Sequence, residues 1–76
     1  MRNFNAVIEL DNNDCSAYIL KENGVEILRK SGYHYTATPQ YVMLQLFNKL
    51  IENGESMFVL HVTDWKGGEN TLKFNC

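Results

Sequence analysis

Residues 38–54 read TPQYVMLQLFNKLIENG and are the one stretch of this chain with a clear helical pattern. Thr38 suits an N-cap, because its hydroxyl can accept a hydrogen bond from a backbone N–H of the first turn. Pro39 then falls at the first helical position, where its missing N–H costs nothing. Gly54 is typical of the residue just past a helix, where a left-handed backbone is common. We therefore predict a helix between Thr38 and Gly54.

The apolar side chains of this helix form a wide stripe rather than a narrow seam. A stripe of that width must be buried against a broad partner, and a sheet is the usual partner in a small mixed domain. We therefore expect the helix to lie on one face of a sheet. The members of the stripe are Met43, Leu46, Phe47 and Leu50, widened by Val42, Leu44 and Ile51.

The segments outside the helix either alternate apolar and polar residues or carry dense apolar runs, as strands do. Asn23 and Gly24 form the dipeptide most typical of a tight hairpin turn. The predicted fold class is α+β, a single antiparallel-rich five-stranded sheet with one helix on one face, in the order βββαββ. We predict one domain over residues 1–76. The predicted strands are residues 4–10, 15–22, 25–30, 57–65 and 70–76, with a bulge at Ser31 and Gly32.

Composition excludes several classes of protein. Of the 76 residues 45% are hydrophobic and the net charge is −2, so the chain should fold but has no basic footprint for nucleic acid. No long apolar run follows Met1, so we predict neither a signal peptide nor a membrane span, and a cytoplasmic location. Cys15 and Cys76 lack nearby partners for a zinc site. We expect both to be reduced, with a disulfide between them as the alternative.

Turn lengths predict how the first three strands pair. A two-residue turn at residues 23–24 and a four-residue turn at residues 11–14 fix which residues face each other, and therefore which face each side chain takes. The expected pairs are Lys21 with Glu26, Leu20 with Ile27, Ile8 with Ala17, and Ala6 with Ile19. The last hairpin is left open: Leu72 and Phe74 join either face, depending on a bulge near Gly67 and Gly68.

This register leaves an apolar patch on the sheet face away from the helix. One helix cannot cover both faces, and an exposed patch of roughly several hundred Å² is typical of an interaction site. Tyr18 should be its best anchor, because aromatic residues dominate interface energetics. Alternatively, the last hairpin covers this apolar face within the same molecule. The predicted protein-binding residues are Val7, Tyr18, Leu20, Val25 and Ile27, with Glu9 and Glu22 beside them.

No group of residues predicts catalysis. His34 and His61 have no metal ligand or nucleophile near them in the sequence, and Gly67 and Gly68 lack the lysine and helix of a phosphate loop. We therefore predict no enzyme activity, no catalytic residue, no metal and no cofactor. Three strands, a helix and a strand ending near Asp64 resemble the first half of the ribonuclease H-like fold. That resemblance implies a metal-dependent nuclease using Asp11 and Asp64, although the helix start carries no carboxylate.

The element order, the length and the Asn-rich composition together resemble small phage-encoded inhibitors of bacterial defence, of the anti-CRISPR type. That resemblance implies an inhibitor that binds a protein machine, where acidic side chains can mimic phosphates. The expected function is thus a small protein-binding module, an inhibitor or accessory protein acting by surface occlusion, on a protein partner or as a homodimer. The acidic candidates are Glu9, Asp11, Asp14, Glu22 and Glu26. The alternative, a nucleic-acid-binding module, would use Tyr33, Tyr35, Trp65, Arg29 and Lys30.

Overall fold

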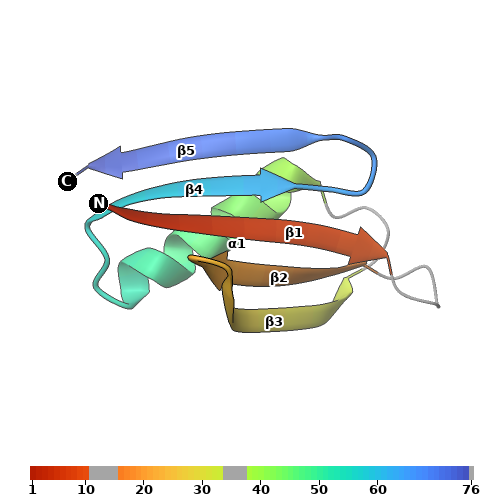
Figure 1. Cartoon of the computed structure of the whole chain (residues 1–76), viewed down its shortest axis with the longest axis horizontal. Coiled ribbons are helices and arrows are strands. Elements are labelled where there is room, and N and C mark those ends of the chain that lie inside the picture. The colour runs from red at the N-terminus through yellow and green to blue at the C-terminus, as the bar shows by residue number, and fades with distance from the viewer. Residues whose placement is uncertain (11–15, 34–37, 76) are drawn as a thin grey trace.

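Five strands and one helix follow one another along the described part of the chain in the predicted order βββαββ (Figure 1). A computed structural model describes residues 1–10, 16–33 and 38–75. The α+β class with a five-stranded sheet and one helix is thus confirmed. The elements are β1 (Arg2–Leu10), β2 (Ser16–Glu22), β3 (Val25–Tyr33), α1 (Pro39–Glu52), β4 (Met57–Thr63) and β5 (Glu69–Asn75).

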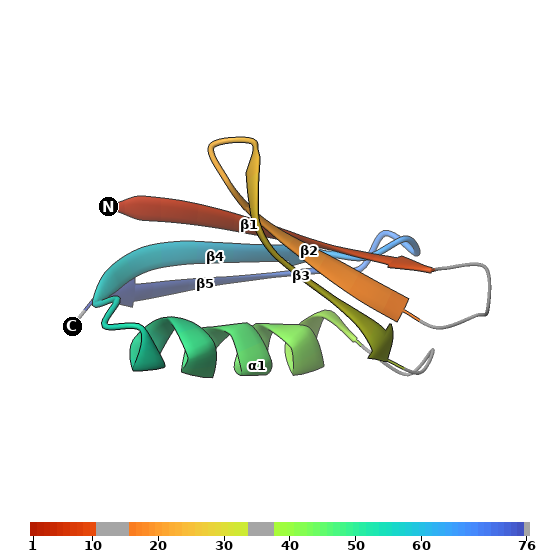
Figure 2. The same cartoon turned by 90° about the horizontal axis from the view of Figure 1, so that it is seen from below.

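The strands lie in the order β3-β2-β1-β4-β5, and every neighbouring pair is antiparallel except β1 with β4. β1 and β4 are parallel. A parallel pair requires a long crossover connection, and α1 forms part of it. β3 and β5 are therefore the two edges of the sheet. The helix lies across one face and crosses it diagonally (Figures 1 and 2), packing chiefly on β4 and β5. We call the opposite sheet face the outer face.

The helix begins and ends where the sequence predicts. The Thr38 side-chain oxygen accepts a hydrogen bond from the Tyr41 backbone N–H at 3.2 Å, and Pro39 is the first helical residue. At the other end Gly54 has φ of 89°, a conformation that glycine adopts without steric cost. The Glu55 N–H then donates to the Leu50 carbonyl at 3.0 Å, which satisfies one of the last free carbonyls of the helix.

The core lies between the sheet and α1. Phe58 is fully buried, and its ring lies 6.0 Å from those of Phe4 and Phe47 and 5.5 Å from that of Phe74. The last hairpin joins this core, because β5 pairs with β4 so that Phe74 lies opposite Phe58 and Leu72 opposite Leu60. The largest buried side chains are Phe4, Phe58, Ile8, Leu46, Leu60, Val42 and Val62.

The β4–β5 turn explains why β5 turns its apolar side toward the helix. Thr63 pairs with Glu69, so residues 64–68 form a longer connection than two glycines alone. An oxygen of the Asp64 side chain accepts hydrogen bonds from the backbone N–H groups of Lys66 at 2.9 Å and Gly68 at 2.6 Å. Asp64 therefore organises this turn.

The pairing of β1 with β2 differs from the prediction by one residue. Ile8 lies opposite Tyr18 and Ala6 opposite Leu20, because the chain uses residues 11–15 as the connection rather than 11–14. Since side chains alternate between faces, a slip of one residue turns the whole strand over. The predicted register of β2 is therefore wrong, and Tyr18 and Leu20 face α1 instead of the outer face. Ile19, expected beneath the helix, lies on the outer face opposite Val7.

Two one-residue irregularities bend β3. Asn23 and Gly24 have the positive φ values, 53° and 81°, of the predicted tight turn, and Lys21 pairs with Glu26 as expected. Leu20 then pairs with Leu28, so Ile27 is an extra residue and its predicted pairing with Leu20 is wrong. The predicted bulge near Ser31 is confirmed by the second register shift. Bulges increase local twist, and β3 curls strongly out of the sheet plane (Figure 2).

Candidate protein-binding groove

The structure divides the predicted patch. Tyr18 and Leu20 are only 2% and 3% exposed and belong to the core beneath α1. Val7 is half-buried on the outer face, whereas Val25 and Ile27 are 64% and 48% exposed on β3. The prediction of one apolar patch on the outer face is wrong, because β2 presents the opposite set of side chains. Tyr18 cannot anchor a partner from its buried position.

A groove between β3 and the second half of α1 brings two of the predicted residues together for a different reason. Its volume is about 130 Å³, and Leu20 and Ile27 both line it. The extra residue at Ile27 bends β3, while α1 packs mainly on β4 and β5, so the two elements diverge here. The lining residues are Leu20, Ile27 and Leu28 from the sheet, with Leu46, Lys49, Leu50 and Asn53 from the helix end.

The groove has an apolar floor and a mixed rim. Leu20, Leu46 and Leu50 are buried and form the floor, while Ile27 and Lys49 are exposed. An apolar cavity of about 150 Å³ holds one benzene-sized group, and sites for drug-sized ligands begin near about 300 Å³. The groove therefore has room for a single leucine-sized or phenylalanine-sized side chain and is too small for a cofactor.

The helix side of the groove was missed by the sequence analysis. Lys49 and Asn53 are four residues apart, so they follow one flank of the helix beside Leu46 and Leu50. That spacing is visible in the sequence. The groove itself depends on the position of the bulge and on the angle of the helix, which the spacing does not reveal.

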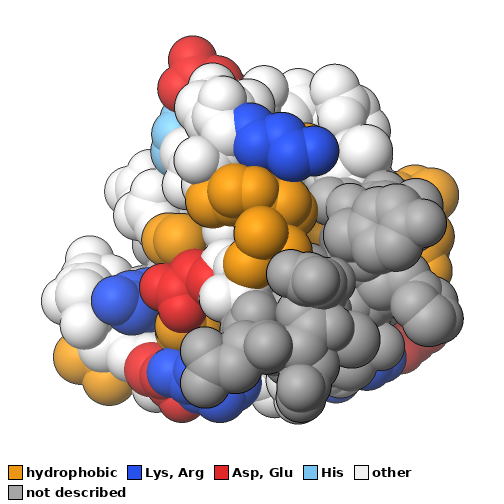
Figure 3. Space-filling view, turned by 90° about the vertical axis from the view of Figure 1, so that its right-hand side faces the viewer, with side chains coloured by type: hydrophobic (Ala, Val, Ile, Leu, Met, Phe, Trp, Pro, Cys, Tyr) orange, Lys and Arg blue, Asp and Glu red, His pale blue; other side chains and the backbone are white. Residues whose placement is uncertain are grey.

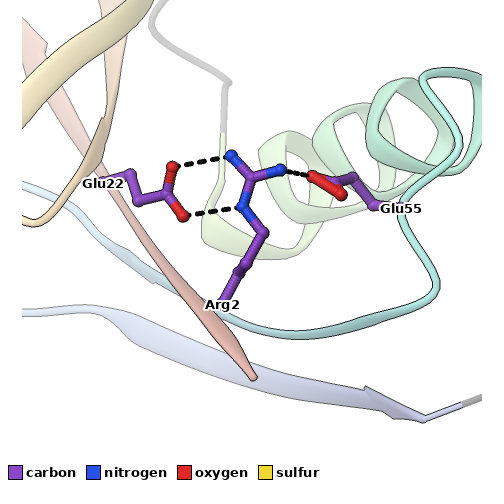
Figure 4. Close-up of polar contacts among 3 residues, drawn as sticks. All are labelled: Arg2, Glu22 and Glu55. Atoms are coloured by element: carbon purple, nitrogen blue, oxygen red, sulfur yellow. Dashed lines mark hydrogen bonds and ion pairs between the residues drawn. The ribbon is translucent and has the colours of Figure 1, made fainter.

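Glu22 is held in an ion-pair cluster at the amino-terminal end of β1 (Figure 4). Arg2 donates from Nε and Nη2 to the two Glu22 carboxylate oxygens, at 2.7 Å and 2.6 Å, and from Nη1 to Glu55. The guanidinium carbon also lies 4.9 Å from the centre of the Phe4 ring. The cluster joins the start of β1, the end of β2 and the residues before β4. Glu22 thus neutralises a cation within the chain, which argues against its use as a phosphate mimic.

Glu22→Gln should lower the melting temperature near neutral pH and make no difference in strong acid. The hydrogen bond from Arg2 holds the pKa of Glu22 below its ordinary value in the folded protein. As the pH falls, the Glu22 carboxylate is therefore protonated in the unfolded chain before it is protonated in the folded protein. The stabilisation is therefore complete above about pH 4.3 and is lost as the pH falls through the lower folded-state pKa. Thermal melts across this range measure it. Glu52→Gln, at an exposed helix position, is the control; identical profiles for the two variants would contradict the cluster's role.

The described side chains of the nucleic-acid alternative lie on separate elements: Arg29 and Lys30 are on β3, whereas Trp65 lies in the β4–β5 turn. Arg29 donates to Glu26 at 2.9 Å, and this hydrogen bond raises the pKa of Arg29. Lys66 lies 5.2 Å from the Trp65 ring centre, at the far end of the molecule from the groove. Figure 3 looks onto that end, where acidic and basic side chains are interspersed. Tyr35 and the side chain of Tyr33 lie outside the part of the chain that the structure describes.

No three His, Cys, Asp or Glu side chains within residues 1–10, 16–33 and 38–75 lie close enough together to hold a metal ion. His61 Nδ1 lies 2.6 Å from the Thr71 hydroxyl, and Asp64 is engaged by the turn. The other candidate ligands and thiols lie outside the described residues: Asp11, Asp14, Cys15, His34 and Cys76. Among the described elements, no helix has the length and apolar character needed to cross a membrane.

The fold and groove define a small α+β protein with one mixed sheet. Comparison of the chain with protein-family models, with curated proteins and with solved structures found no match. Its function is therefore inferred from its own surfaces.

Proposed function

We propose that this chain is a protein-binding module that blocks a surface of another protein in the cytoplasm. The observation that carries the proposal is the apolar groove with Ile27 at its rim. An open apolar groove beside an exposed large aliphatic residue is typical of a docking site, since burying both on binding is favourable. Val25, two residues before Ile27 on β3, is 64% exposed and gives this strand a second exposed aliphatic side chain.

The lining of the groove favours one kind of partner. Its size admits one apolar anchor side chain, and fully buried anchors supply most of the binding energy at interfaces. Lys49 forms no ion pair with any residue in the described ranges, so its charge remains available at the rim. We therefore infer a partner segment with a leucine-sized or phenylalanine-sized side chain beside a carboxylate.

An inhibitory role suits a domain of this size. The groove is too small for a cofactor, and a small protein that docks through such a surface acts by covering what it binds. The element order that resembles small phage-encoded inhibitors of bacterial defence supports this role. Glu9, exposed on the outer face, lies away from the groove lining and has no part in the proposed contact.

Selection of peptides from a random display library tests the proposal, because the library samples many sequences and the partner need not be identified. The full chain, Ile27→Asp and Leu44→Asp serve as baits, and Leu44 is an exposed leucine on α1 outside the groove lining. The wild type and Leu44→Asp should enrich the same peptides, with an apolar residue beside Asp or Glu. Ile27→Asp should bind a synthetic copy of such a peptide at least about tenfold more weakly by calorimetry.

Circular dichroism of the three proteins confirms that each is folded before the comparison. Equal binding of the selected peptide to all three would place the site elsewhere. Failure of the wild type to enrich any common sequence would refute the groove as a peptide-binding site. Lys49→Glu gives a further check, because the selected peptides should then carry a basic neighbour in place of the acidic one.

A further inference from the structure

We propose that the edge of β5 binds the β5 edge of a second copy of this chain. The two strands pair antiparallel about a twofold axis at Thr71 and join the two sheets into one continuous sheet. This surface is separate from the groove and does not depend on its function. Three features of β5 carry the inference: its outward-facing backbone groups, its pattern of charge, and the apolar helix flank beside it.

β5 presents a regular row of backbone groups at the edge of the sheet. In the β4–β5 turn, the Asp64 N–H donates to the Gly68 carbonyl at 3.0 Å. Hydrogen-bonded and non-hydrogen-bonded pairs alternate along an antiparallel ladder. The pair of His61 with Thr71 is therefore non-hydrogen-bonded, and the Thr71 N–H instead donates to the Asn70 side-chain oxygen at 3.1 Å. By the same alternation, the backbone groups of Glu69, Thr71 and Lys73 point away from β4.

The other edge of the sheet lacks such a row. β3 carries an extra residue at Ile27 and a second irregularity near Ser31, so its outward groups are interrupted. Bulges of this kind protect an edge strand from pairing with another chain. The β4–β5 register runs without a shift from Met57 opposite Asn75 to Thr63 opposite Glu69. β5 is therefore the edge that can receive a strand along its whole length.

The charges on β5 complement themselves in one register only. With the twofold axis at Thr71, Glu69 of each copy lies opposite Lys73 of the other, which forms two cross-strand ion pairs. An axis at Lys73 places two lysines together, and an axis at Leu72 pairs neither charge with its opposite. Neither Glu69 nor Lys73 forms an ion pair with another residue in the described ranges, so both remain available.

An apolar flank of the helix lies beside this edge. The Phe47 ring packs on the Phe74 ring of β5 at 5.2 Å, which places this side of α1 next to the edge strand. Leu44 and Ile51, three residues before and four residues after Phe47, share its side of the helix. They are 60% and 38% exposed, although they continue the apolar stripe of the helix. Pairing of two β5 strands sets the two flanks on the same side of the joined sheet, where they can cover each other.

Sedimentation velocity over a concentration series, with the full chain, tests the pairing and its register. The wild type should dimerise reversibly. Lys73→Glu places two carboxylates opposite each other and Glu69→Lys places two ammonium groups together, so each should raise the dissociation constant by about tenfold or more. The double variant Glu69→Lys with Lys73→Glu restores opposite charges and should return the dissociation constant to near the wild-type value.

Thr71→Pro removes the outward N–H at the axis and should leave a folded monomer, whereas Thr71→Val keeps the N–H and should dimerise. Circular dichroism melts establish that each variant is folded. A wild type that remains monomeric at millimolar concentration would overturn the proposal. So would a dimer that survives both single charge reversals, or one that Ile27→Asp dissociates, because either result places the contact elsewhere.

Discussion

Leu20→Glu should abolish the cooperative unfolding transition, whereas Ile27→Glu should leave the protein folded. Leu20 is 3% exposed and packs in the core beneath α1, so the substitution buries a carboxylate that has no partner. Such a burial costs several kcal/mol, which is comparable to the whole stability of a small domain, about 5–15 kcal/mol. Ile27 is 48% exposed at the rim of the groove, where a carboxylate remains hydrated.

Far-ultraviolet circular dichroism melts of the two variants measure this difference. The pair is a direct test of the β2 register, because turn lengths alone predict that Leu20 and Ile27 face each other on the outer face. Two folded variants would favour that predicted register. Two unfolded variants would indicate that Ile27 is also covered in the folded protein.

Phe58→Ala should lower the free energy of unfolding by about 3–5 kcal/mol, the usual cost of removing a fully buried aromatic ring. Phe58 is 0% exposed and lies at the centre of a ring cluster with Phe4, Phe47 and Phe74. Its removal therefore loosens contacts between β1, β4, β5 and α1 at once.

Urea denaturation followed by tryptophan fluorescence measures the loss. Met57→Ala is the matched control, since Met57 precedes Phe58 on the same strand but is 47% exposed. An exposed side chain away from the core should change the free energy of unfolding by only about 0.5 kcal/mol. Similar losses for the two variants would show that the ring cluster is not the centre of the core.

The features that the sequence predicts correctly are set by neighbours in the chain. Thr38, Pro39 and Gly54 mark the ends of the helix through local hydrogen bonds and backbone angles, and those ends are confirmed. The turn at Asn23 and Gly24 and the bulge near Ser31 are local in the same way. Element order and fold class follow from such signals, because each depends on a few adjacent residues.

The features that the sequence does not predict depend on lengths and angles that accumulate along the chain. One further residue between Leu10 and Ser16 turns β2 over and moves Tyr18 and Leu20 into the core. One extra residue at Ile27 opens the groove. Neither change alters the hydrophobic pattern, so the sequence alone does not reveal which face of the sheet these side chains take.

The parallel pairing of β1 with β4 sets the order in which the protein can assemble as it is synthesised. Arg2 pairs with Phe58, a partner 56 positions later (58 − 2). The first three strands can form a meander as soon as they emerge from the ribosome, but the free side of β1 must wait until β4 has been made. Contacts between residues so distant in the chain slow folding, because the intervening chain loses entropy before they form. The nascent chain thus carries its central strand, β1, paired on one side only until β4 has been made.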